Sequence, residues 1–234
     1  MLAWQLAAVL VGNKLLLVSP TDVLARLFAL VGEEGFFGVV GFTFARIVLG
    51  FFSGLVLGVL LALLAGRFRF VEILLWPYMV TVKTVPVASF VVIALIWISE
   101  RELSVLISFL MVLPIIYTNI LEGIRSVDIK MLEMADVFKM TWGRRVRYIW
   151  LPSIKPFAVS GCRIAIGLAW KSGVEAELIG NPDGSVGGAL YQSKLFIETA
   201  DVFAWTVVIV CVSVVFEKLF VLLLKKIFGR ICDR

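Results

Sequence analysis

Long apolar stretches alternate with short polar segments along this chain of 234 residues. Residues 38–65, 73–98, 103–121, 157–174 and 202–224 each come close to or exceed the roughly 20 residues that a helix needs to cross a bilayer. Strands of a membrane barrel would instead show short segments of alternating hydrophobicity. The pattern therefore predicts an all-α, polytopic membrane bundle, with residues 1–234 forming a single transmembrane domain.

The first 37 residues fit this pattern less well. Residues 2–18 are apolar but carry Gly12, Asn13 and Lys14 in the middle. We expect a short or partial first span there, followed by an amphipathic segment, and hence five to six transmembrane helices in all. Gly50, Gly54 and Gly58 recur every four residues on one face of the first clear span, which is typical of a close helix-packing surface.

Composition narrows the class of protein further. With 61% hydrophobic residues and a mean hydropathy of +1.04, the chain has more apolar surface than a soluble domain can bury. The three cysteines are scattered and there is no histidine, so we expect no metal site, no disulfide framework and no cofactor. The net charge of +5 is not accompanied by an aromatic and basic platform, so we expect no nucleic-acid partner.

The charges indicate the orientation of the chain. Basic residues gather at Arg67 and Arg69, along residues 125–147 and after Leu224, whereas acidic residues mark positions 33–34, 100–102 and 183–198. The positive-inside rule places the 125–152 segment in the cytoplasm and the 180–201 loop outside. The expected location is the cytoplasmic membrane of a bacterium.

The 125–152 segment is organised like a folded hairpin. Apolar residues are spaced between its charges as in an amphipathic helix. Asp128 can cap a first short helix and Thr141 a second, and Leu151-Pro152 should close the segment because proline disfavours helix at the residue before it. A docking element and a solvated loop held by lipid phosphates both remain open from charge alone.

The hairpin resembles the cytoplasmic loop of permease subunits of binding-protein-dependent ABC importers. Their signature reads Glu-Ala-Ala, three residues, Gly, nine residues, Ile, one residue and Leu-Pro, and this spacing recurs from Glu133 to Pro152. The resemblance extends from residues 17–24 through Arg46 to residues 185–188, and is strongest to the nitrate, sulfonate and taurine branch. It implies an upstream span that would end near Trp4, so one helix of the family is expected to be missing here.

Two residues of the signature differ from the family. Met134 replaces the first alanine, and Lys139 stands where the family has glycine between the two short helices. A lysine at positive φ would cost on the order of 1 kcal/mol. Either the turn is strained, or the first helix continues toward Gly143.

The resemblance implies partners and roles. The chain lacks a phosphate-binding Gly-rich loop with Lys-Ser/Thr, so ATP hydrolysis is expected in two cytoplasmic ATPase subunits. The chain itself is not expected to be an enzyme, because it has no histidine and no aspartate within the clear spans. A second permease copy or paralogue, an external substrate-binding protein and membrane lipid are the other expected partners.

The implied ATPase-coupling residues are Glu133, Ala135, Lys139, Thr141, Trp142, Gly143, Ile149, Leu151 and Pro152. Glu133 would be the anchor, or would instead pair with Lys130 on a solvated helix, and Arg144, Arg145 and Arg147 would contact lipid headgroups.

Charged residues inside spans are costly and are candidates for the substrate pathway. Lys83 precedes the helix-breaking Val85-Pro86, and Lys171 and Glu177 lie in the fourth clear span or just beyond it. Lysines facing a cavity would suit a small polar or anionic solute. Lys83 could instead snorkel to the interface, Lys171 could pair with Glu175, and Arg163 could reach the cytoplasmic interface.

The 180–201 loop is rich in turn-forming residues. By the resemblance it lies under the external binding protein, with Asp183, Gly184, Gly187 and Gly188 as contacts. The expected function is that of an importer permease coupled to a separate ATPase. The alternative is an ATP-independent channel or a membrane scaffold protein.

Overall fold

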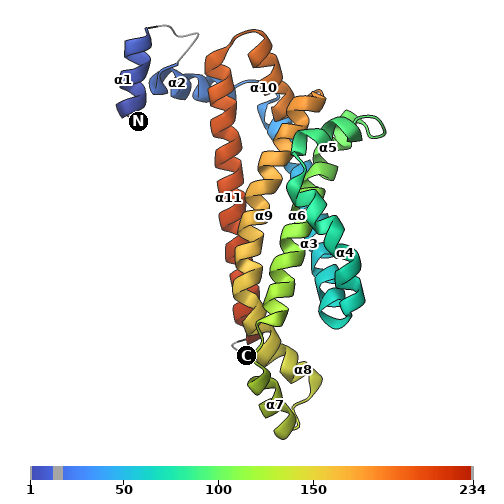
Figure 1. The fold of residues 1–234 in the computed structure, drawn as a ribbon. Coiled ribbons are helices and arrows are strands. Elements are labelled where there is room, and N and C mark those ends of the chain that lie inside the picture. The colour runs from blue at the N-terminus through green and yellow to red at the C-terminus, as the bar shows by residue number, and fades with distance from the viewer. Residues whose placement is uncertain (1, 13–17, 233–234) are drawn as a thin grey trace. The chain divides into compact units, whose positions relative to one another are not determined.

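The computed structural model describes residues 2–12 and 18–232, and every regular element among them is a helix (Figure 1). This confirms the all-α class. In chain order the helices are α1 (Leu2–Val11), α2 (Pro20–Val31), α3 (Phe36–Arg67), α4 (Arg69–Thr84), α5 (Val87–Ala94), α6 (Glu100–Arg125), α7 (Ile129–Val137), α8 (Trp142–Arg145), the π-helix η1 (Val146–Trp150), α9 (Leu151–Gly180), α10 (Val186–Leu195) and α11 (Thr199–Cys232).

The chain divides into two compact units. The first contains Met1–Leu49, Pro86–Ile107 and Trp170–Val214, and the second contains Gly50–Val85, Ser108–Ala169 and Val215–Arg234. Four helices, α3, α6, α9 and α11, contribute residues to both units. The hairpin lies in the second unit and the loop after α9 lies in the first.

Among the described residues, α3, α6 and α11 are each long and apolar enough to cross a membrane, and α4 with α5 add a fourth span if the pair is counted as one broken span. These helices contain the predicted stretches 38–65, 103–121 and 202–224. Helix α9 has 30 residues but does not reach the same apolar level, because charged residues recur along it. The predicted number of five to six transmembrane helices is therefore not confirmed. At 10 residues, α1 is too short to span a bilayer, and Asn13 and Lys14 lie outside the described residues.

The predicted helix break at Val85-Pro86, within the apolar stretch 73–98, is confirmed. Helix α4 ends at Thr84, Val85 is extended with φ −74° and ψ 133°, and α5 begins after Pro86. Proline disfavours helical geometry at the residue before it and has no amide hydrogen for the helical ladder, so the break falls at this dipeptide. The stretch therefore forms two helices.

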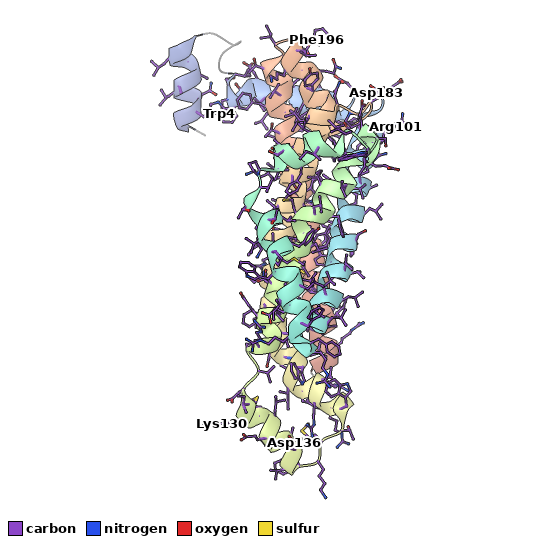
Figure 2. The ribbon with its side chains drawn as sticks, turned by 45° about the vertical axis from the view of Figure 1, so that its right-hand side comes forward. Trp4, Arg101, Lys130, Asp136, Asp183 and Phe196 are labelled. Carbon is purple, nitrogen blue, oxygen red and sulfur yellow. The ribbon has the colours of Figure 1, made fainter. Side chains whose placement is uncertain are left out.

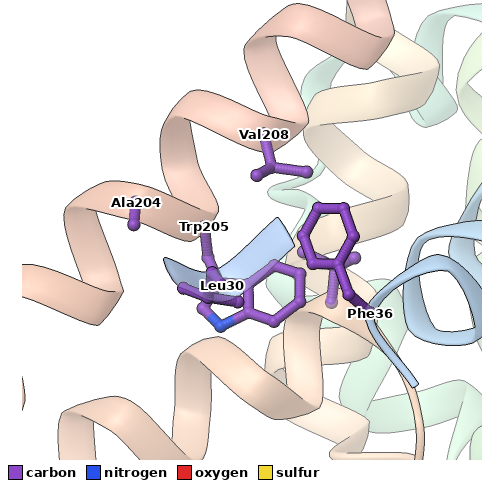
Figure 3. Packing of buried hydrophobic residues seen from close by; sticks show 6 residues of the cluster. Leu30, Phe36, Ala204, Trp205 and Val208 are labelled. Carbon is purple, nitrogen blue, oxygen red and sulfur yellow. The ribbon is translucent and has the colours of Figure 1, made fainter. Parts of the chain in front are cut away.

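In the first unit, α2 is held against the start of α11. The hydroxyl of Ser19 accepts a hydrogen bond from the Asp22 amide at 3.2 Å and caps α2. Buried Leu30 of α2 packs with Phe36 and Trp205, whose rings stack at a centroid distance of 5.5 Å (Figure 3). These contacts form an apolar core in this unit.

In the second unit, small residues let α3 approach α6 closely. A Cβ atom added at Gly54 would lie 2.9 Å from the Cβ of Val112, and one added at Gly58 would lie 3.0 Å from the Cβ of Ile116. Distances of this size leave no room for a larger side chain. The predicted packing role is thus confirmed for Gly54 and Gly58.

Candidate functional site

Residues 125–152 fold as a hairpin of two short helical arms, α7 and α8–η1. The side chain of Asp128 accepts a hydrogen bond from the Lys130 amide at 2.9 Å, so α7 begins at Ile129 as predicted. Figure 2 labels Lys130 and Asp136, which lie near the two ends of this helix. The first arm is therefore fixed by its own sequence.

Lys139 forms the apex of the hairpin in the left-handed conformation, with φ 49°. Helix α7 ends at Val137, so of the two alternatives the strained turn is the one observed. The Lys139 amide donates to the Asp136 carbonyl at 3.0 Å, and the Met140 amide donates to the Ala135 carbonyl at 2.9 Å. This pair of bonds is a Schellman motif, the usual end of a helix before a left-handed residue.

An ion pair joins the two arms. Arg145 Nη2 lies 2.5 Å from Asp136 Oδ1, and Arg145 Nε donates to the Met140 carbonyl at 3.0 Å. Arg145 therefore holds the corner, whereas the sequence suggested a lipid contact. Thr141 precedes α8 as expected, but its side chain makes no capping hydrogen bond.

The prediction that Leu151-Pro152 ends the segment is wrong. Leu151 is helical, with φ −61° and ψ −45°, and α9 continues directly from η1. The Leu151 amide donates five residues back, to Val146, and the Ser153 hydroxyl donates to the Ile149 carbonyl at 2.9 Å. The wider π-turn lets a proline without an amide hydrogen enter the helix. The second arm and α9 thus form one uninterrupted helical path.

The hairpin has a small core and an exposed apolar corner. Ala135 and Ile149 are buried and pack with Val127. Val137, Phe138 and Trp142, here called the apolar corner, have exposed fractions of 78%, 73% and 73%. Side chains of this size left exposed together on a polar loop are typical of an interaction surface.

The remaining coupling candidates lie on α7, on α8 and at the start of α9. Gly143 and Pro152 are exposed, and Leu151 is half-buried. Glu133 is exposed, and its side chain makes no hydrogen bond or ion pair with any residue that the structure describes. The alternative pairing of Glu133 with Lys130 is not observed.

In the first unit, a buried carboxylate holds the loop after α9. Glu177 is fully buried, and its Oε2 accepts hydrogen bonds from Thr43 Oγ1 at 2.7 Å and from the Gly187 amide at 3.3 Å. Thr43 Oγ1 accepts in turn from the Val186 amide at 2.9 Å. Together with the Ser185 hydroxyl, which accepts from the Gly188 amide at 2.9 Å, these side chains satisfy the first amides of α10. Glu177 is therefore a structural anchor for the start of α10.

The glycines of this loop differ in how closely they are packed. A Cβ at Gly187 would lie 2.3 Å from the Cβ of Glu177, and one at Gly188 would lie 2.7 Å from the Pro182 carbonyl. Both glycines are buried, whereas Asp183 and Gly184 are exposed. Of the four residues expected to contact a binding protein, only Asp183 and Gly184 present a surface.

The charged candidates for the substrate pathway are accessible. Lys83 is exposed in the second unit, and its Nζ lies 3.3 Å from Thr118 Oγ1. Pro86 and Lys171 are exposed in the first unit, and no ion pair between Lys171 and Glu175 is present among the described residues. Neither lysine is neutralised by an acidic side chain that the structure describes.

Two polar contacts within the first unit were not found from the sequence. Thr43 gives no signal, because a threonine in an apolar span is common and its partner Glu177 is 134 residues away. Arg26 forms a two-pronged contact with Asp201, with Nε to Oδ1 at 2.5 Å and Nη2 to Oδ2 at 2.7 Å. The hydrogen bond to Asp201 raises the pKa of the Arg26 guanidinium above its ordinary value, so the arginine stays protonated in this ion pair. Only the acidic first turn of the last helix could have suggested it.

Comparison with known proteins agrees with the motif in the hairpin. Residues 54–230 match the family described as the binding-protein-dependent transport system inner membrane component. The chain is 30% identical to the putative aliphatic sulfonates transport permease protein of Bacillus subtilis, over 96% of this chain and 82% of that protein. It is 25% identical to the taurine transport system permease protein of Escherichia coli, over 92% and 80% of the two chains. It is 27% identical to the nitrate import permease protein of Synechocystis, over 76% and 68%. The chain therefore belongs to the binding-protein-dependent transport system inner membrane components, and is a multi-pass permease subunit of an ABC importer in the plasma membrane.

Proposed function

We propose that this permease forms the membrane pathway for a small anionic solute, and that its 125–152 hairpin docks on a cytoplasmic ATPase subunit that drives transport. The observation that carries the docking proposal is the apolar corner, Val137, Phe138 and Trp142, whose side chains are the most exposed large apolar groups of the hairpin. Burying one large apolar side chain contributes roughly 1.5–3 kcal/mol. A partner groove that covers the corner would therefore gain several kcal/mol.

The unpaired carboxylate of Glu133 also supports a partner at the hairpin. Glu133 lies one turn before Val137 and has no partner among the described residues. A basic or amide-rich groove would complement its carboxylate next to the apolar corner. Glu133 thus supplies orientation, and the corner supplies most of the contact energy.

The hairpin is rigid enough to transmit a displacement. The Schellman bonds and the Asp136–Arg145 ion pair fix the two arms. The second arm continues through η1 into α9, which ends at Gly180 beside the loop that Glu177 anchors. A shift of the docked hairpin would be passed to the start of α9, in line with an alternating-access mechanism.

The solute proposal rests on the relatives and on the lysines. The named relatives carry aliphatic sulfonates, taurine and nitrate, which are small molecules with oxyanion groups. Lys83 and Lys171 are exposed without an acidic partner in the described part of the chain. An unneutralised ammonium group near the pathway would attract a small anion and would reject a cation.

The partners follow from the same proposal. Two ATPase subunits would bind two permeases, either two copies of this chain or this chain and a paralogue. An external substrate-binding protein would contact the exposed Asp183 and Gly184. ATP hydrolysis belongs to the ATPase subunits in this scheme.

Retention of the candidate ATPase on the purified permease tests the docking face. Phe138 and Phe70 are both 73% exposed, but only Phe138 belongs to the hairpin. Phe138→Ala should weaken ATPase binding at least tenfold, since it removes roughly 1.5–3 kcal/mol of burial. Phe70→Ala should leave binding unchanged. Equal effects of the two variants would reject the hairpin as the docking surface.

Transport into vesicles tests the solute class. Lys171→Gln should raise the half-saturating concentration of an aliphatic sulfonate without changing ATPase retention, whereas Lys194→Gln, at another exposed lysine of the same unit, should do neither. Uptake that prefers a neutral or cationic solute would contradict the anion proposal and leave the docking proposal standing.

A further inference from the structure

A cationic groove lies in the second unit, between the start of α9 and the end of α11. Its volume is about 620 Å³, and it is lined by Lys155 and Arg163 of α9 and by Lys225 of α11. Ser160 adds a hydroxyl, and the remaining lining is apolar, including Val159 and Ile164. The transport mechanism proposed above does not use this groove.

No acidic side chain that the structure describes pairs with the three cations of the groove. No acidic side chain lines the groove. The side chains of Lys155, Arg163 and Lys225 make no hydrogen bond or ion pair with any residue that the structure describes. Like charges that gather around one groove repel each other, so the arrangement favours an anion between them.

The position of Arg163 along α9 also favours a bound anion. Arg163 follows Lys155 by about two turns of α9, or ~12 Å along the helix axis. It lies within the apolar stretch 157–174, where an unpaired charge is expensive. A bound anionic group would lower that cost.

The mixed lining selects the kind of anion. Lysine ammonium groups and an arginine fork both suit a phosphate, and the arginine can bind two of its oxygens. Val159 and Ile164 are part of the lining, and Leu219, Leu222 and Leu223 are exposed on the two turns of α11 before Lys225. A small inorganic anion gains nothing from contact with an apolar surface, whereas the acyl chain of a lipid would be buried against it. Basic pockets beside membrane helices are known to hold anionic lipid headgroups.

We infer that this groove binds the phosphate headgroup of an anionic phospholipid, with Lys155, Arg163 and Lys225 around the phosphate and the acyl chain along α11. The lipid would hold α9 to α11 next to the point where the hairpin joins α9. Anionic phospholipid is thus a structural ligand of the permease.

Thermal unfolding of the purified full-length permease in detergent tests this inference. The probes are phosphatidylglycerol, phosphatidylcholine with the same acyl chains, and inorganic phosphate. The native chain should be stabilised by phosphatidylglycerol and much less by either of the others. The Arg163→Gln/Lys225→Gln variant should bind phosphatidylglycerol roughly tenfold or more weakly, because it loses two of the three groove cations.

A matched control separates the groove from general surface charge. Lys226→Gln/Arg230→Gln also removes two positive charges, but from exposed positions of α11 that do not line the groove. This variant should keep the native affinity for phosphatidylglycerol. The charge-preserving Arg163→Lys/Lys225→Arg variant should also bind. An equal loss in the control variant, or equal stabilisation by phosphatidylcholine, would overturn the inference. Equal stabilisation by inorganic phosphate would reassign the groove to small anions and would overturn it as well.

Discussion

The main-chain amide of Met140 donates to the Ala135 carbonyl at 2.9 Å, across a hairpin corner whose apex is Lys139. Ala135 is fully buried, and Met140 packs against the same small core. The corner therefore has the hydrogen bonds and the apolar contact of a glycine-terminated helix, although a lysine stands at the left-handed position.

Replacing Lys139 with glycine should stabilise the hairpin. A side chain at φ 49° costs on the order of 1 kcal/mol, and glycine removes that cost. Hydrogen exchange of the Met140 amide should slow by about fivefold. The same substitution at Lys130, inside α7, should destabilise the helix by roughly 0.5 kcal/mol. Faster exchange in Lys139→Gly would show that the lysine side chain itself supports the corner.

Removing the hydroxyl of Thr43 should loosen the start of α10. Thr43→Val keeps the shape of the side chain but takes away the donor to Glu177 and the acceptor for the Val186 amide. Leaving these buried groups unpaired should cost about 2–3 kcal/mol. Hydrogen exchange of the Val186 and Gly187 amides should accelerate accordingly. Thr43→Ser should retain slow exchange, and equal exchange in both variants would contradict the assigned role of the hydroxyl.

A methyl group at position 187 should not be tolerated. The Cβ of Gly187→Ala would lie 2.3 Å from the Cβ of Glu177 and 2.7 Å from the Leu178 nitrogen. The backbone must shift to relieve this overlap, which should lower the free energy of unfolding by about 3 kcal/mol or more. A lower melting temperature in detergent would show this loss of stability. Gly167→Ala, which meets no atom within 4 Å, should be neutral or should stabilise α9 by up to about 1 kcal/mol. A native melting temperature for Gly187→Ala would refute the close packing described here.

Local signals predicted the parts of this protein that local chemistry determines. The Asp128 cap, the start of α8 after Thr141 and the close-packed Gly54 and Gly58 all follow from neighbouring residues or helical spacing. The division of residues 73–98 into two helices also follows from a local signal, the helix-breaking Val85-Pro86.

The other differences arise from contacts distant in sequence or from unusual helix geometry. Pro152 was expected to stop a helix, and the π-turn with its displaced hydrogen bond is not encoded by any simple pattern. The pairing of Thr43 with Glu177 depends on how α3 and α9 pack, so the sequence identified Glu177 as a costly charge and a substrate-pathway candidate but not as an anchor of α10. Arg145 was assigned to lipid because its partner Asp136 becomes adjacent only after the corner forms.

Stimulation of ATP hydrolysis by the substrate-loaded binding protein tests most directly whether the hairpin couples the permease to its ATPase. The measurement compares reconstituted complexes that carry the native chain, Glu133→Ala or Glu34→Ala, since both glutamates are exposed but only Glu133 lies on the hairpin. The proposal predicts that Glu133→Ala abolishes the stimulation or the assembly, while Glu34→Ala behaves as the native chain. Full stimulation in Glu133→Ala, or solute transport that continues without any ATPase, would contradict the central claim.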